Sequence, residues 1–175
     1  TCIGRPVAGV RVVVAALDGG GAAEPVPTDP HGVRLASTPL EDVAPGVLGE
    51  LWVSGPMVSP LYEDQPQANA RSKRIEPDGT LMHNTGDLVV RDGSGLLWFC
   101  GRRDHGVQVK GVLVPPVPIE NTLSGHPKVM QSAVVGVVDP CTEVLEPVAC
   151  LRLVPGAKLD DELCEDLAAM LAGTR

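Results

Sequence analysis

The most informative part of this 175-residue chain is His83-Asn-Thr-Gly-Asp-Leu-Val-Val-Arg-Asp-Gly-Ser-Gly-Leu-Leu-Trp-Phe-Cys-Gly-Arg-Arg-Asp-His105. Two apolar runs, residues 87–91 and 96–100, flank the turn residues Asp92-Gly-Ser-Gly95. Apolar runs on either side of a Gly-rich turn predict a β-hairpin. Beyond this hairpin the pattern changes from strands to mixed strands and helices. We therefore expect a domain boundary at residues 102–105, between units 1–101 and 106–175.

The residues upstream of the hairpin predict further strands. Residues 10–17 are rich in β-branched side chains, and in residues 49–54 Leu51 and Val53 alternate with their neighbours before Gly-Pro ends the run. Residues 19–30, rich in Gly, Ala, Pro and Asp, predict a loop. This first half is therefore expected to be mostly β.

The residues downstream predict a different arrangement. The expected elements are a hairpin at 107–114, a short helix from Pro118 to about Gly125, strands at 132–138 and 148–154, and a helix at 159–173. Prolines 115, 116 and 118 forbid continued strand pairing, and proline suits the first helical position. Asp160 can cap the last helix, whose apolar side chains share one stripe. The overall fold class is α+β, with a small sheet under two helices in the second half.

Composition restricts the partners and the compartment. The 14 basic and 22 acidic side chains leave a formal net charge of −8, which disfavours nucleic acid and anionic membrane surfaces. The five cysteines form no Cys-x-x-Cys pair, so they predict neither a disulfide framework nor a zinc site and indicate a reduced, cytoplasmic protein. No apolar stretch approaches the roughly 20 residues that span a bilayer, so we expect a soluble protein without membrane insertion.

General site templates are nearly absent from the sequence. It contains no Gly-x-Ser-x-Gly elbow, His-Glu-x-x-His motif or phosphate-binding loop. The four scattered histidines have no metal-ligand spacing, and Gly93 and Gly95 are better explained as turn residues than as a phosphate cradle. No metal site is predicted.

Three segments in a fixed order carry a resemblance to a known family. They are Gly49-Glu-Leu-Trp-Val-Ser-Gly-Pro56, His83-Asn-Thr-Gly-Asp-Leu88 and Gly95-Leu-Leu-Trp-Phe-Cys-Gly-Arg-Arg-Asp-His105. With Ile3–Val10 upstream and residues 126–137 downstream, they resemble the adenylate-forming superfamily, which includes acyl-CoA synthetases, adenylation domains and luciferases. The resemblance implies a distorted β-barrel-like subdomain, residues 1–101, followed by a small α/β domain with a three-stranded sheet and helices.

The resemblance also implies a nucleotide site. Asp87, in the Thr85-Gly-Asp element, corresponds to the carboxylate that grips the ATP ribose, and a carboxylate can accept hydrogen bonds from both hydroxyls of a diol. Arg102 corresponds to a family arginine at the nucleotide, where a permanent cation suits ribose and phosphate oxygens.

Three further positions correspond to moving parts of the family. Asp104 matches the hinge about which the small domain swings between the two steps. Lys110-Gly111 matches a loop that enters the site for the second step, where glycine permits close backbone approach. The family continues with an aromatic or His and an Arg, whereas Val112 and Leu113 stand here, which argues against ordinary thioester formation with CoA.

The resemblance implies an ATP-dependent enzyme that activates a small-molecule carboxylic acid as its acyl-AMP. Trp98–Arg102 and the proline-containing stretch after the hinge look most like olefin β-lactone synthetases, so we expect a fatty or β-hydroxy fatty acid and intramolecular lactone formation. The alternatives are an acyl-CoA ligase or adenylation domain that forms a thioester, and a non-catalytic β-rich interaction module.

The resemblance places other parts of the machinery outside this chain. The adenylation lysine is expected beyond Arg175, and the phosphate loop and the ligands of Mg²⁺ are likewise expected elsewhere, in the remaining amino-terminal body. Without that body, the apolar strands at residues 10–16 and 51–53 are expected to be exposed.

Overall fold

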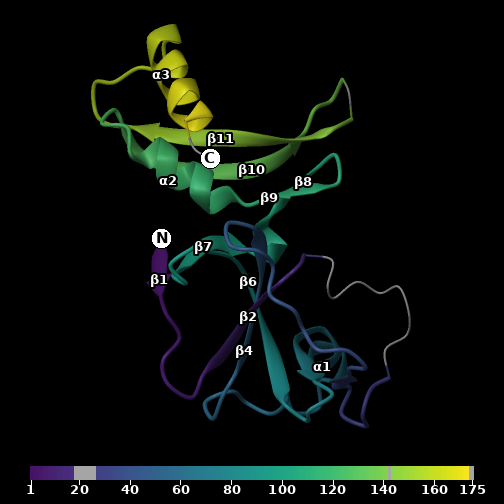
Figure 1. The fold of residues 1–175 in the computed structure, drawn as a ribbon. Helices are drawn as coiled ribbons and strands as arrows, with labels where there is room; N and C mark the ends of the chain where they lie inside the picture. Colours follow the sequence, from purple (N-terminus) through teal and green to yellow (C-terminus); the bar gives the residue numbers. More distant parts are fainter. Residues whose placement is uncertain (18–26, 142, 174–175) are drawn as a thin grey trace. The chain divides into compact units, whose positions relative to one another are not determined.

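The computed structural model describes residues 1–17, 27–141 and 143–173 (Figure 1). Most of the loop predicted at 19–30 therefore lies outside the described residues. The chain divides into two compact units, Thr1–Phe99 and Cys100–Arg175.

The first unit is built on one branched sheet of seven strands. Its elements are β1 (Cys2–Gly4), β2 (Arg11–Ala15), β3 (Arg34–Leu35), β4 (Leu48–Ser54), α1 (Pro66–Ser72), β5 (Lys73–Ile75), β6 (Leu81–Arg91) and β7 (Leu97–Arg102), which runs on into the second unit. The main path is β1-β7-β6-β4-β2, and β5 joins β3 to β6. β6 and β7 are neighbours, as the predicted hairpin requires, but the barrel-like form is not confirmed in the described residues, where the sheet ends at β1 and β2.

The strands of this sheet bury side chains on both faces. Val13 and Trp52 belong to one buried cluster with Leu40, whereas Val14 and Leu51 belong to another with Val89. The expected exposed apolar face is therefore wrong, since Val14 is 0% exposed and Leu51 is 8% exposed. Within this unit, the segment between β3 and β4 covers these strands: the Asp42 carboxylate accepts a hydrogen bond from Val14 N at 2.8 Å.

The second unit packs two helices on a β-hairpin. Its elements are η1 (Arg103–His105), β8 (Val107–Val109), β9 (Val112–Val114), α2 (Pro116–Ser124), β10 (Val129–Val138), β11 (Leu145–Leu153) and α3 (Asp161–Ala172). The described strands pair only as β8-β9 and β10-β11, so the predicted three-stranded sheet is wrong for this part of the chain. Leu123 of α2 and Leu163 and Leu167 of α3 form its buried core.

The two helices begin where local chemistry favours it. α3 starts at Asp161, two residues later than predicted, and Asp160 caps it as predicted: its side chain accepts a hydrogen bond from Leu163 N at 3.0 Å. α2 starts at Pro116, two residues earlier than predicted, because Pro115 is extended and supplies the cap position. Among the described residues, the helices are too short or too polar to cross a membrane.

Candidate nucleotide-binding site

The Thr85-Gly86-Asp87 element forms a bulge in the sheet of the first unit. Glu50 of β4 lies opposite Leu88 of β6, and Trp52 lies opposite Asn84. Two steps along β4 therefore correspond to four steps along β6, so β6 carries two extra residues at this point. A bulge interrupts the ladder and redirects side chains, and bulges are over-represented beside active sites.

Short-range hydrogen bonds hold this bulge in shape. Thr85 Oγ1 donates to Leu51 O of β4 at 3.1 Å and accepts from Asp87 N at 3.1 Å. Gly86 N donates to the Asn84 side chain at 2.8 Å, and Gly86 has a φ of 74°. This left-handed conformation suits glycine, which explains the residue between Thr85 and Asp87. The backbone of Asp87 is therefore held on one side by the Thr85 hydroxyl and on the other by the pairing of Leu88 with Glu50.

The second unit carries Arg102 and Asp104 around its short helix η1. Arg102 Nε lies 3.8 Å from Asp104 Oδ1, with the side chains 47% and 73% exposed. Such an exposed pair is worth little because water and salt screen it. Arg102, His105 and Glu120 line an open hollow of about 420 Å³ along β10. The guanidinium therefore stands at a solvent-accessible surface where an anionic group could reach it.

Lys110 and Gly111 are the two turn residues of the β8-β9 hairpin. Both have positive φ, 50° and 83°, and Val109 lies opposite Val112. Two-residue turns with two positive φ values match the twist of the flanking strands. The predicted second-step loop is thus a hairpin tip, and space around Gly111 is open.

A cluster in the first unit, which sequence reasoning missed, lies at the start of β6. We call Tyr62, Asn69, Lys73 and His83 the Lys73 cluster. Asn69 is 1% exposed; its Oδ1 accepts from Tyr62 N at 2.7 Å, and its Nδ2 donates to His31 O at 2.8 Å. Burial lowers the pKa of His83 from its usual value, and the nearby positive charge of Lys73 lowers it further. No sequence motif marks this cluster, because its members come from separate elements.

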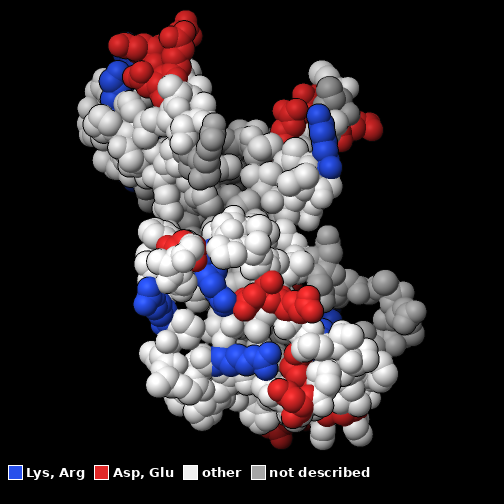
Figure 2. Space-filling view, viewed as in Figure 1, with Lys and Arg blue, Asp and Glu red and all other residues white. Residues whose placement is uncertain are grey.

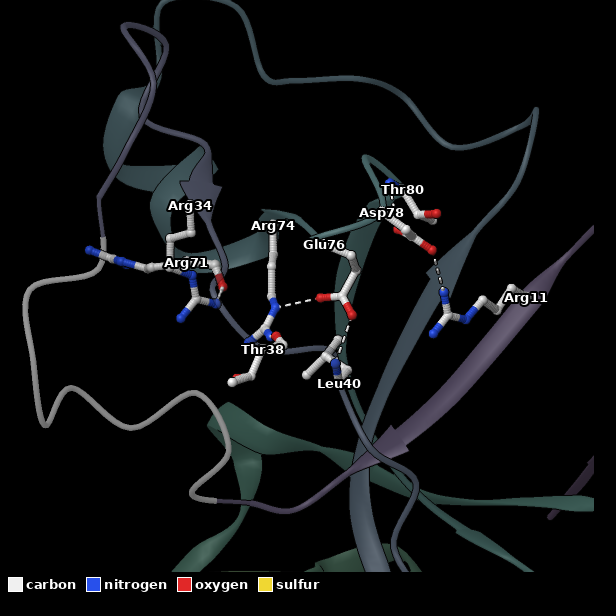
Figure 3. A network of polar contacts seen from close by, with 9 residues as sticks. All are labelled: Arg11, Arg34, Thr38, Leu40, Arg71, Arg74, Glu76, Asp78 and Thr80. Atoms are coloured by element: carbon white, nitrogen blue, oxygen red, sulfur yellow. Dashed lines mark hydrogen bonds and ion pairs between the residues drawn. The ribbon is translucent and has the colours of Figure 1, made fainter.

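A second polar network in the first unit joins residues of several elements (Figure 3), and within it the buried Arg34 Nε has no hydrogen-bond partner among the described residues. Glu76, 3% exposed, accepts from Arg74 Nε at 2.6 Å and from Leu40 N at 2.7 Å. Arg34 lies over the Trp52 ring, 5.6 Å from its centroid. Burial lowers the pKa of Arg34, and the positive charge of Arg74 lowers it further. The negative charge of Glu50 acts in the opposite direction and raises it. The bonds to Glu76 fasten the segment around Leu40 to β5.

The predicted site residues divide between the two units. Thr85 and Asp87 are brought together by the bulge of the first unit, whereas Arg102, Asp104, Lys110 and Gly111 belong to the second.

Acidic side chains gather over α3, which bears Asp161 and Glu162 in its first turn (Figure 2). Across the described ranges, no group of three His, Cys, Asp or Glu residues could hold a metal ion.

Comparison with known proteins identifies the class of this fold. The chain is 34% identical over 160 residues to an olefin β-lactone synthetase of Xanthomonas campestris pv. campestris, covering 89% of this chain and 26% of that protein. It is 39% identical over 145 residues to a feruloyl-CoA synthase of an Amycolatopsis species, covering 81% and 28%. No profile of a known protein family matches the chain.

Solved structures agree with these relatives. The amide bond synthetase McbA from Marinactinospora thermotolerans superposes with a TM-score of 0.68 at 27% identity, over 98% of this chain and 29% of that protein. The chain belongs to the adenylate-forming, AMP-binding superfamily. It spans less than a third of the length of these relatives, which include both β-lactone synthetases and CoA ligases.

Proposed function

We propose that this chain is a portion of an ATP-dependent enzyme that activates a carboxylic acid as its acyl-adenylate. The single observation that carries the proposal is the bulge at Thr85-Gly86-Asp87, where β6 gains two residues opposite β4. Gly86, at positive φ, lies inside β6 at this bulge, and bulges are over-represented beside active sites. Relatives that match this chain are named olefin β-lactone synthetase, feruloyl-CoA synthase and benzoate–CoA ligase.

Asp87 is the residue to which we assign the ribose hydroxyls of ATP. Its carboxylate can accept two hydrogen bonds from a vicinal diol, and its backbone N–H is already held by Thr85 Oγ1. Arg102, exposed at the end of β7 and lining an open hollow, is the candidate for ribose and phosphate oxygens. The described residues offer no cluster that fits Mg²⁺, so we assign no metal-dependent step to this chain.

For the second step we propose that the hydroxyl of a β-hydroxy fatty acid displaces AMP and closes a β-lactone. Two matched relatives are olefin β-lactone synthetases, at 34% and 33% identity. The Lys110-Gly111 turn is followed by Val112 and Leu113 of β9 and then by Pro115 and Pro116, whose side chains offer no hydrogen-bond donor or cation to a bulky acceptor. Intramolecular attack needs no second substrate and benefits from enforced proximity.

Thioester formation with CoA is the second candidate, because matched relatives include feruloyl-CoA synthase and benzoate–CoA ligase. The two candidates differ in a single measurable property. With ATP and a β-hydroxy acid, a β-lactone synthetase forms the acyl-adenylate and releases AMP as the hydroxyl closes the lactone, in the absence of CoA. A CoA ligase needs CoA to release AMP from the acyl-adenylate.

The test of the activation step is Asp87→Asn in the whole enzyme, with acid-dependent exchange of pyrophosphate into ATP as the assay. A neutral amide loses charge-assisted acceptance, which is worth about 1.5 to 3 kcal/mol, so exchange should fall by at least about tenfold. Asp78→Asn, on the exposed turn before β6, is the matched control. Unchanged exchange in a folded Asp87→Asn enzyme would remove the ribose-binding role.

A further inference from the structure

Lys73 is a buried cation whose surroundings do not neutralise it. The residue is 1% exposed, and within the described residues its ammonium has one hydrogen-bond acceptor, Ser59 O, and one aromatic ring, that of Tyr62 at 5.3 Å. No described carboxylate lies within ion-pair distance, and burial lowers the pKa of Lys73. Burying a charge without an opposite charge is unfavourable, so an apolar side chain of equal length would stabilise this position better. Stability alone does not explain the lysine.

The contacts of Lys73 fasten the segment between β4 and α1. Its ammonium donates to Ser59 O, while the side chain of Asn69 in α1, four residues before Lys73, bonds to both the backbone N and O of Tyr62. Residues 59–62 are thus attached at two points to the end of α1. Ser59 Oγ adds a local bond to Leu61 O at 2.9 Å. Ser59, Pro60 and Tyr62 of this segment are exposed, and Leu61 is partly buried.

The same lysine is adjacent to the strand that carries the nucleotide motif. Lys73 of β5 lies directly opposite His83 of β6. His83 Nδ1 lies 3.2 Å from Ser72 O, and its ring meets that of Tyr62 edge to face at 6.3 Å between centroids. His83 is two residues before Thr85, the first residue of the bulge. Displacement of residues 59–62 would therefore release one side of β6 just before Asp87.

We propose that Lys73 is a positioning residue, which fastens residues 59–62 against His83 and so fixes the start of the bulge that presents Asp87 to the nucleotide. The expected effect on ATP binding rests on the proposed function, whereas the contacts of Lys73 do not. The lysine touches neither the reacting atoms nor ATP. It acts through the Ser59 carbonyl, the Tyr62 ring and the His83 imidazole.

The test uses Lys73→Met, which retains length and apolar volume but removes the charge and all three donors. Lys158→Met, at an exposed lysine of the second unit, is the matched control. In the 175-residue chain, hydrogen exchange of amides 59–65 should accelerate by about tenfold or more in Lys73→Met, while β2 and β4 remain protected. The pKa of His83, followed by NMR, should rise because a neighbouring positive charge has been removed. An unchanged pKa of His83 would show that the Lys73 ammonium does not act on the imidazole, and would overturn the proposal.

In the whole enzyme, Lys73→Met should raise the KM for ATP in pyrophosphate exchange by about fivefold or more, with a smaller effect on kcat. Unchanged exchange rates at 59–65, or an unchanged KM for ATP, would overturn the proposal. Asp87→Asn separates the two hypotheses: if it lowers pyrophosphate exchange by at least about tenfold while Lys73→Met leaves the KM for ATP unchanged, the proposed function stands and the positioning role fails. If Lys73→Met does not fold, Tyr62→Leu removes the covering ring at a 41% exposed position and should accelerate exchange of the same amides.

Discussion

Replacing Thr85 by valine tests whether the bulge is held by the hydrogen bonds that surround it. Valine has nearly the same shape but no hydroxyl, so it removes the bond to Leu51 O and the bond from Asp87 N, both 3.1 Å long. A net hydrogen bond contributes about 0.5 to 1.5 kcal/mol, so the two bonds together predict a loss of about 1 to 3 kcal/mol in the free energy of unfolding. The side chain is only partly buried, which favours the lower half of that range.

The assay is urea unfolding of the chain, with the slope of the transition as a check that the unfolded state is unchanged. Thr85→Ser keeps the hydroxyl and loses only a methyl group, so it should retain most of the stability that Thr85→Val loses. Hydrogen exchange of the amides of residues 85–88 should be faster in Thr85→Val than in the parent chain, but not in Thr85→Ser. Equal stability of Thr85→Val and the parent chain would refute the idea that these bonds hold the bulge.

Two further predictions concern the turn before β7 and the hinge that we propose at Asp104. Hydrogen bonds from Trp98, Ser94 and Leu96 lower the pKa of Asp92 from 3.8 to about 2. Because the folded pKa is depressed, the stabilisation should be present above about pH 4 and lost as the pH falls through about 2. The urea midpoint of Asp92→Asn should therefore fall less across this range, and parallel curves would contradict the assignment. Asp104→Pro should leave pyrophosphate exchange largely intact while slowing release of the final product, because proline fixes a dihedral that a hinge must change. Equal slowing of both steps would indicate that Asp104 is only structural.

Local patterns were sufficient where a single segment determines its own conformation. The Asp92–Gly95 turn, the Lys110-Gly111 hairpin and the cap of α3 at Asp160 all depend on residues close together in sequence. α1 was missed because its seven residues carry no apolar stripe, and its helix is secured by Asn69, which bonds to residues outside it. The predicted barrel and third strand depend on long-range pairing, which no local pattern specifies.

The sequence by itself determined the family, through the order of its motifs, and the identity of Asp87 as the candidate ribose ligand. Only the tertiary structure decided that Thr85–Asp87 is a bulge of two extra residues, because a bulge is defined by the partner strand β4. The tertiary structure also decided the burial of Lys73, because nothing in the sequence distinguishes it from an ordinary surface lysine. Its burial depends on Ser59 and Tyr62 folding back over it, and such a contact between separate segments exists only once the chain has packed.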